Sequence, residues 1–297
     1  MIQAANGVGL LLATLGAIGF SFKAILVKLA YQYHVDAETL LALRMGLSLP
    51  FFLAMGAVAD RRAQHRLTPG DWGWMAALGF SGYYLASYLD FLGLRHITAG
   101  LERLILFLYP TLVILLSAIF LAKPIGRRTV AALALCYLGI GLAVGHDLRV
   151  MGEPGEVLLG CALVFASALS YALYLMVNGE VVGRLGAMRV TAFATTIACL
   201  LSIGQFVVLR PLSALALPWQ VYALGLAMAL FSTVAPVWLV SEAIRRLGAG
   251  PVSLTGTLGP VVTIFLGWLM LDEALGPGQL GGAALVIAGV LVMARRR

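Results

Sequence analysis

The sequence predicts an all-α membrane protein with ten transmembrane helices, arranged as two five-helix halves that form an inverted-topology repeat. Three observations support this prediction: the composition, a series of ten apolar segments, and an internal similarity at a fixed spacing. The 297-residue chain is 61% hydrophobic and only 11% charged, whereas about 25% of the residues of a soluble protein are charged. The composition therefore predicts a multi-pass membrane protein.

Each apolar segment is long enough to cross a bilayer, which takes about 20 residues. Turns that contain Gly, Pro or charged residues separate the segments. The expected spans are 8–30, 38–59, 71–93, 98–120, 128–145, 157–178, 187–209, 217–240, 250–270 and 277–294.

The last third of the chain resembles the middle third after a shift of 150 residues. Between 95 and 145, 13 of 51 positions are identical to their mates without a gap, among them Gly100 with Gly250 and Pro110 with Pro260. We place the two halves at 1–147 and 148–297. Because each half has an odd number of spans, the halves must enter the membrane with opposite orientation, as in many secondary transporters.

The positive charges of the loops predict the orientation. Thirteen Lys and Arg residues fall on the side of the termini and four on the other side, so both termini should be cytoplasmic and the protein should lie in a bacterial inner membrane. The net charge of +7 then reflects basic cytoplasmic loops, and we expect no nucleic-acid partner.

An enzyme is not expected. The Gly79-Phe80-Ser81-Gly82 stretch matches an intramembrane serine protease motif, but that chemistry needs a histidine base on a neighbouring helix. The four histidines fall in loops or at span ends. We also expect no metal site, no cofactor and no ATP-binding loop, because their ligand patterns are missing.

Seven ionisable residues within or near spans belong to the first half, and their repeat mates are mostly uncharged: Lys23, Lys28, Arg44, Asp90, Arg95, Glu102 and Arg103. Charge inside a membrane is unfavourable and usually marks a functional pathway. Lys23, Glu102 and Arg103 are therefore candidates, although Glu102 also suits the first turn of a helix for electrostatic reasons. Lys28 and Arg95 are explained mainly by their positions near the ends of spans, from which a long charged side chain can reach water.

Aromatic residues and prolines form two further groups of candidates. Tyr84 and Tyr88 share a helix face, and a buried tyrosine needs a partner for its hydroxyl. These rings either line a cavity or take part in ordinary helix packing. Pro110 and Pro260 occupy equivalent positions in their halves, where they act as hinges or as tolerated membrane prolines.

Several stretches resemble the EamA type of the drug/metabolite transporter superfamily. The clearest are Gly100–Thr111 with the preceding Arg95–Ala99, its second-half counterpart around Pro260, and Leu271-Asp272-Glu273. The first half departs from the pattern, since Ala122-Lys123 replaces the usual Gly-Glu pair. Within the family, the chain is similar to YddG-type exporters of aromatic and other amino acids.

The resemblance implies a ten-helix secondary transporter that exports amino acids with broad specificity by alternating access. The alternatives are a carrier of the same superfamily for another metabolite or drug, and a channel-like facilitator. The expected substrate-binding residues are Tyr84, Tyr88, Phe107, Tyr171, Trp238, Thr257, Lys23 and Arg103, with hinges at Pro110 and Pro260 and gates at Arg95, Glu242 and Arg245. The expected partners are an amino acid and the lipid bilayer; a monomer is plausible.

The driving force is left open. Proton coupling requires a deeply buried carboxylate, and the sequence places Asp90 and Glu102 near the outer surface. Facilitated export down a concentration gradient is therefore equally compatible with the sequence.

Overall fold

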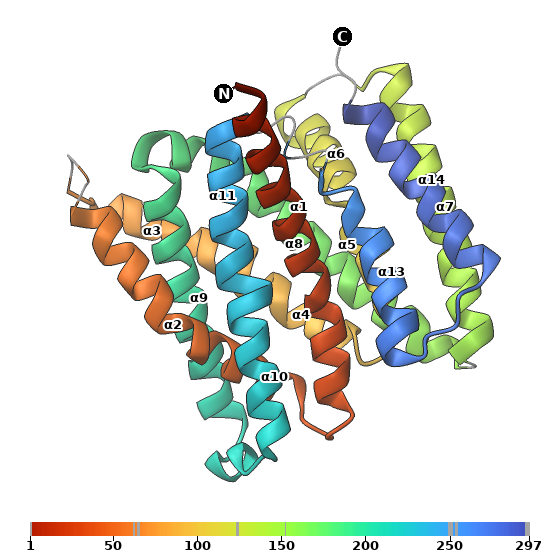
Figure 1. The fold of residues 1–297 in the computed structure, drawn as a ribbon, viewed down its shortest axis with the longest axis horizontal. Helices are drawn as coiled ribbons and strands as arrows, with labels where there is room; N and C mark the ends of the chain where they lie inside the picture. The colour runs from red at the N-terminus through yellow and green to blue at the C-terminus, as the bar shows by residue number, and fades with distance from the viewer. Residues whose placement is uncertain are drawn as a thin grey trace.

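The computed structural model describes residues 2–61, 63, 66–122, 125–151, 153–248, 252 and 255–294. Every regular element within these ranges is helical. Over them the chain passes ten times along a bundle, and both termini lie at the same end (Figure 1). We call this the terminal end and the opposite one the far end.

The helices follow one another in antiparallel order. Seven helical segments are long and apolar enough to cross a membrane, and shorter apolar helices accompany them. The first five passes are α1 (Ile2–Tyr31), α2 (Ala37–Arg61), α3 (Pro69–Leu78) with η1 (Gly79–Leu85) and α4 (Ala86–Gly93), α5 (Ala99–Leu106) with α6 (Tyr109–Leu121), and α7 (Arg127–Met151). The last five are α8 (Pro154–Leu185), α9 (Ala187–Leu209), α10 (Trp219–Ala229) with η3 (Leu230–Val234) and α11 (Ala235–Leu247), α13 (Leu258–Leu271), and α14 (Pro277–Ala294). The short η2 (Leu212–Leu215) lies between α9 and α10.

Several helices extend beyond the predicted spans. α1 begins at Ile2, α7 continues to Met151, α8 to Leu185 and α11 to Leu247. Asp147, which the sequence places in a loop, consequently lies near the end of α7 and is fully buried.

Four passes are interrupted at related positions. α5 ends at Leu106, and a turn at Phe107 and Leu108 leads into α6, whose first turn contains Pro110. Proline lacks a backbone N–H and clashes with the preceding turn, which explains the break. A turn at Gly256 and Thr257 precedes α13 in the same way. In addition, η1 and η3 are π-helical segments within the third and eighth passes.

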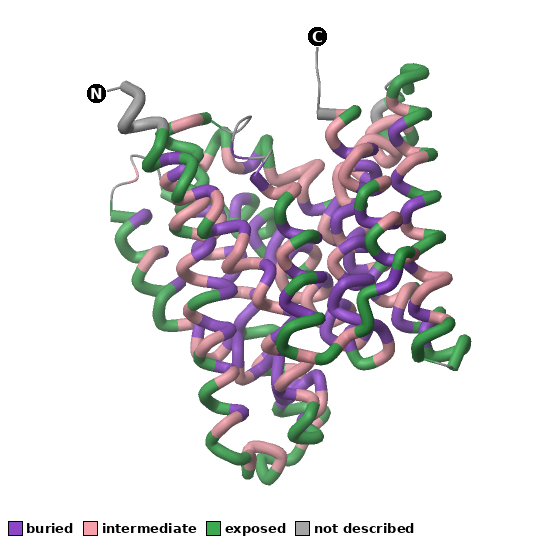
Figure 2. Tube along the Cα trace, turned by 45° about the vertical axis from the view of Figure 1, so that its right-hand side comes forward, coloured by how far each residue is buried: buried purple, intermediate pink, exposed green. Residues whose placement is uncertain are grey.

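The tightest helix pairs join the two halves of the chain. α7 packs along α14, α2 along α9, and α1 against α11 and α13. Small residues permit the first pairing, since a Cβ atom on Gly139 would lie 2.6 Å from the carbonyl oxygen of Gly282. Buried residues concentrate along the middle of the bundle (Figure 2).

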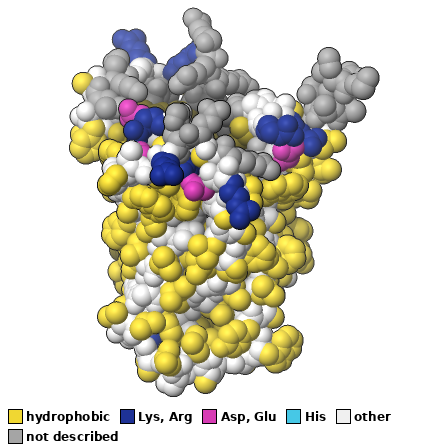
Figure 3. Space-filling model, turned by 90° about the vertical axis from the view of Figure 1, so that its left-hand side faces the viewer, with side chains coloured by type: hydrophobic (Ala, Val, Ile, Leu, Met, Phe, Trp, Pro, Cys, Tyr) yellow, Lys and Arg dark blue, Asp and Glu magenta, His cyan; other side chains and the backbone are white. Residues whose placement is uncertain are grey.

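The surface fits a membrane environment. On the face drawn in Figure 3, charged side chains gather toward the terminal end, above a wall of apolar side chains. On this face the charged side chains of this multi-pass membrane protein are thus distributed as the sequence predicts. Several residues on which the sequence argument depends lie outside the described ranges. They are Gly250, the repeat mate of Gly100, Ser253, the repeat mate of Arg103, and five of the thirteen basic residues: Arg62, Lys123 and 295–297.

Candidate functional site

Three charged side chains from three helices meet inside the bundle. Lys23 of α1 donates a hydrogen bond of 2.5 Å from Nζ to Oδ2 of Asp90 on α4, and its Nζ lies 3.1 Å from Oε1 of Glu102 on α5. Asp90 is 1% exposed and Glu102 is 0% exposed. One ammonium group thus serves two buried carboxyl groups. We call these three residues the charged triad.

Two arginines lie around the charged triad. Arg44 on α2 donates from Nε to Oγ1 of Thr233 at 3.0 Å, and its guanidinium lies 5.5 Å from the ring centroid of Phe91. Arg103 follows Glu102 on α5 and approaches Gly259 of α13 so closely that a Cβ atom there would lie 2.9 Å from its Nη2. The Nε of Arg103 has no hydrogen-bond partner among the described residues.

A row of aromatic rings extends from Arg103 toward the terminal end. Phe107 meets Tyr109 edge to face with ring centroids 6.4 Å apart, and Tyr109 meets Tyr171 at 5.5 Å. Tyr171 stacks on Tyr174 at 5.4 Å, and the hydroxyl of Tyr174 lies 3.0 Å from that of Tyr83. Arg103 lies one helical turn before Phe107, whose backbone N–H donates to the carbonyl oxygen of Arg103 at 3.1 Å. We call these five rings the aromatic row.

A second aromatic group does not join the aromatic row. Tyr84 stacks on Tyr88 with centroids 6.4 Å apart. The hydroxyl of Tyr88 donates to Oε1 of Glu38 at 3.0 Å, and Glu38 also pairs with Arg210 at 3.1 Å. Tyr88 is thereby connected to the far end of the bundle.

The loop between α4 and α5 is held by two acidic residues that the sequence places in external loops. Asp147 accepts hydrogen bonds from the backbone N–H and the hydroxyl of Thr98, at 3.0 and 3.1 Å. Glu273 accepts from the N–H of Ala99 at 2.8 Å. Lys28 is bound rather than free, since its Nζ donates to the carbonyl oxygen of Ile97 at 2.7 Å. These contacts fix the start of α5 and, with it, Glu102.

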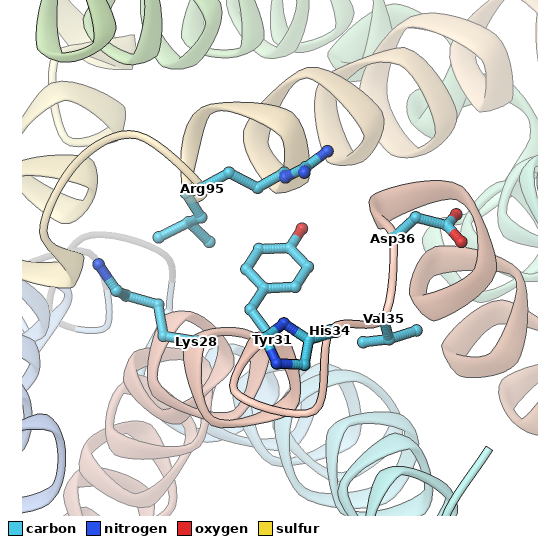
Figure 4. Close-up of a pocket in the computed structure, with 7 residues that line it drawn as sticks. Lys28, Tyr31, His34, Val35, Asp36 and Arg95 are labelled. Atoms are coloured by element: carbon cyan, nitrogen blue, oxygen red, sulfur yellow. The ribbon is translucent and has the colours of Figure 1, made fainter.

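Two pockets open at the far end. One of about 400 Å³ is lined by Lys28, Tyr31, His34, Val35, Asp36, Leu94 and Arg95. Figure 4 shows the Tyr31 ring at its centre, with the hydroxyl pointing toward the Arg95 side chain. The second, of about 450 Å³, shares Lys28 and Tyr31 and reaches Glu273. Arg95, an expected gate residue, is exposed here.

The remaining predicted site residues lie elsewhere. Trp238 is 63% exposed on α11. Glu242 pairs with Arg245 at 2.6 Å and with Arg246 at 2.7 Å, all within α11, so these ion pairs link no second helix. Thr257 lies at the turn before α13.

Sequence reasoning missed how deeply the acids are buried. A signal was available for Asp90 and Glu102, because their repeat mates are the uncharged Val240 and Val252. For Asp147 and Glu273 no comparable signal existed, since acids beside a turn also suit exposed loops. Within the described ranges, no group of three or more His, Cys, Asp or Glu side chains could hold a metal ion.

Comparison with known proteins places this arrangement in a family. The model of the EamA-like transporter family matches residues 7–145 and again 158–295. The chain belongs to the EamA-like transporter family. This EamA-like protein is accordingly a transporter and not an enzyme.

Its relatives have transporter names. The uncharacterized transporter YcbK of Bacillus subtilis is 29% identical over 95% of this chain and 92% of its own length. The threonine/homoserine exporter RhtA of Escherichia coli is 28% identical over 68% and 64%, and a probable terminal-alkyne amino-acid exporter of Streptantibioticus cattleyicolor is 26% identical over 84% and 80%. A solved crystal structure shares the fold with a TM-score of 0.62 at 18% identity, covering 96% of both chains.

Proposed function

We propose that this EamA-like transporter exports amino acids across a bacterial inner membrane by alternating access. The observation that carries the proposal is Arg103, a cation without a hydrogen-bond partner for its Nε, at one end of the aromatic row. A guanidinium group binds a carboxylate through paired hydrogen bonds, and aromatic rings offer an apolar surface to a side chain. The two exporters among the relatives, which carry amino acids by name, support the same substrate class.

Within this proposal, Lys23 and Arg103 have different roles. The ammonium of Lys23 already contacts two carboxyl groups, so a substrate carboxylate would be a third acid around one cation. We assign the substrate carboxylate to Arg103 instead. Phe107 and Tyr171 of the aromatic row then contact the substrate side chain, together with Thr257, while Tyr84, Tyr88 and Trp238 stay candidates for the wall of the pathway.

We further propose that 1–147 and 148–297 are inverted repeats. In support, Cys136 of α7 contacts its own repeat mate, since its Sγ lies 3.6 Å from the carbonyl oxygen of Val286 on α14. Mates can meet in this way only near an axis that relates the halves. The π-helical segments η1 and η3, and the left-handed residues Ala122 and Asp272, also recur at about the same spacing.

Alternating access then uses the interruptions of the helices. The turns before Pro110 and Pro260 interrupt the regular helical pattern with i→i−3 bonds, from the N–H of Leu108 to the carbonyl oxygen of Ile105 and from the N–H of Gly259 to that of Gly256, and are the proposed hinges. Arg95 is the proposed gate residue at the far end, which we place outside the cell, with both termini cytoplasmic. The proposed inner gate is the region of Glu242 and Arg245.

Counterflow in proteoliposomes tests the proposal. Vesicles loaded with one unlabelled amino acid should take up and accumulate the same amino acid in labelled form from the outside solution. Loading the vesicles with a panel of amino acids, sugars and nucleosides identifies the substrate class. Stimulation by another solute class alone would indicate a different carrier, and transport without trans-stimulation would indicate a facilitator. Either result contradicts the proposal.

Arg103→Gln identifies the residue for the carboxylate. Loss of a charged hydrogen bond is worth about 1.5–3 kcal/mol, so we expect KM to rise roughly 10- to 150-fold. Arg149→Gln is the matched control, because Arg149 is exposed at the far end of α7. An unchanged KM in Arg103→Gln would exclude the assigned role.

A further inference from the structure

Three of the four carboxyl oxygens of the charged triad lack a hydrogen-bond donor among the described residues. Oδ1 of Asp90 and both side-chain oxygens of Glu102 have no hydrogen-bond partner among the described residues, although all three atoms are buried. An ionised carboxylate is an acceptor only and, when buried, normally accepts a hydrogen bond at each oxygen. Lys23 donates to Asp90 but only approaches Glu102. Glu102 is therefore the less satisfied acid.

A proton on Glu102 would resolve this deficit. The two carboxyl groups lie close together, because an oxygen of Asp90 and an oxygen of Glu102 lie 2.5 and 3.1 Å from the same Nζ of Lys23. Two ionised carboxylates repel and neither can donate, whereas a protonated carboxyl donates to the carboxylate beside it. In the dry interior, where burial penalises unpaired charge, one ammonium, one carboxylate and one carboxylic acid form a neutral and hydrogen-bonded set.

We propose that the charged triad is a proton-binding site and that the α-ammonium group of the transported amino acid competes with the proton for Glu102. This rests on the proposed function, because it takes an amino acid as the substrate. Arg103 reaches Gly259 of α13, whose carbonyl oxygen accepts a hydrogen bond at 3.2 Å from Ser21 of α1, two positions before Lys23. A zwitterion whose carboxylate binds Arg103 therefore brings its ammonium group toward the charged triad. The proton leaves the Glu102 carboxyl for water, and the substrate ammonium replaces it beside the carboxylate.

Charged or titratable groups around the charged triad lie on α1, α2 and α5, and Asp147 of α7 and Glu273 lie at the start of α5. Arg44 acts on Asp90 from α2, and Arg103 acts on Glu102 from α5. Tyr31 of α1 also interacts with Asp90. α13 contributes Gly259 and α14 contributes Gln279 near the start of α5, neither of which titrates. Arg44 and Arg103 stay charged at all physiological pH values. The two carboxyl groups are therefore the groups that bind and release the proton.

Tyr31 connects the far-end pockets to the helix that carries Asp90. Tyr31 lines both far-end pockets, and its hydroxyl donates to the carbonyl oxygen of Phe91, the neighbour of Asp90, at 2.6 Å. Glu102 itself is covered in this conformation, as a proton-loaded state requires. Movement about the turn at Phe107 and Leu108 would expose it to the substrate from the other side.

The exchange of one proton for one zwitterion has a defined energetic signature. A pH difference of about one unit sustains a roughly tenfold substrate gradient, because it is a tenfold difference in proton concentration and one proton is exchanged for one substrate. The exchange moves one net charge, so a membrane potential of about 60 mV has the same effect. Transport in vesicles should respond to each gradient separately.

Proton release on binding tests the site directly. The purified full-length protein is placed in weakly buffered detergent with a pH indicator, and L-phenylalanine or L-threonine is added. We expect proton release with these probes and none with their N-acetyl derivatives, which keep the carboxylate but lack the ammonium group. Proton uptake, or equal release with the N-acetyl derivatives, would overturn the competition.

Variants connect the release to the charged triad. Glu102→Gln should abolish proton release and make any residual counterflow independent of the pH gradient. Asp90→Asn should move the pH range of proton release to lower pH. The ammonium of Lys23 would then be shared with no second carboxylate and would stabilise the ionised form of Glu102. Glu153→Gln, in an exposed position at the far end, is the matched control.

The outcomes separate this inference from the proposed function. Wild-type counterflow of amino acids that ignores both the pH gradient and the potential would overturn the proton site but leave amino-acid export intact. Failure of every amino acid in counterflow would overturn both. Should Glu102→Gln prove inactive, the wild-type measurements with L-phenylalanine and its N-acetyl derivative decide alone.

Discussion

Gly259 offers a way to displace the proposed carboxylate-binding group without removing it. A Cβ atom at this position would lie 2.9 Å from Nη2 and 3.1 Å from Nε of Arg103, which is closer than such atoms pack. Gly259 lies within α13, and its backbone is helical, so alanine suits the helix there. In Gly259→Ala the guanidinium group must therefore move.

The expected effect is large on binding and small on stability. The atoms that must yield are the end of a flexible side chain, so we expect the free energy of unfolding to change by less than about 1 kcal/mol, as for a replacement that avoids backbone clashes. Loss or distortion of one charged hydrogen bond to the substrate costs about 1.5–3 kcal/mol. KM should accordingly rise roughly 10- to 150-fold.

The assay is counterflow at varied substrate concentration, together with a thermal unfolding curve. Gly204→Ala is the matched control, because a Cβ atom on this helical glycine of α9 would meet no atom within 4 Å. In an Arg103→Gln background, Gly259→Ala should add nothing, since both changes act on one interaction. Additive losses, or an unchanged KM in the single variant, would refute the reasoning.

Two further predictions concern stability and are checked by thermal unfolding of the purified protein. Asp147→Ala leaves the buried N–H and hydroxyl of Thr98 without their acceptors, which should cost about 1–3 kcal/mol; an unchanged midpoint would contradict the role of Asp147 as an anchor. Gly139→Val places a side chain against the carbonyl oxygen of Gly282 and should cost about 1–3 kcal/mol through overpacking. Gly141→Val, which meets open space, should not, and equal losses would argue against the close pairing of α7 and α14.

Helix positions could be predicted because they depend on local properties. A span needs a run of apolar residues, and the breaks before Pro110 and Pro260 follow from a missing N–H. The comparison of the two halves at a spacing of 150 residues also indicated Glu102 and Arg103 as positions where the halves differ. These inferences require no knowledge of which helices touch.

Burial across helices could not be predicted in the same way. Position along a helix indicates depth in the membrane but not what covers a side chain. Glu102 lies one turn from a loop, yet it is fully buried, because Asp147 and Glu273 hold that loop against the bundle. Lys23 and Asp90 are 67 positions apart, and only the packing of α1 against the neighbouring passes makes them partners. The same limit applies to Trp238, whose exposure depends on the helices around α11.

The π-helical segment η1 determines the direction in which Asp90 points. A π-helical turn holds one residue more than an α-helical turn, so every side chain after it is rotated by about 100° relative to an uninterrupted α-helix. Asp90 follows η1 within the same pass. The same residues wound as a regular α-helix between Gly79 and Leu85 would therefore turn the carboxyl group of Asp90 away from Lys23. The winding of η1 thus helps to hold the charged triad together.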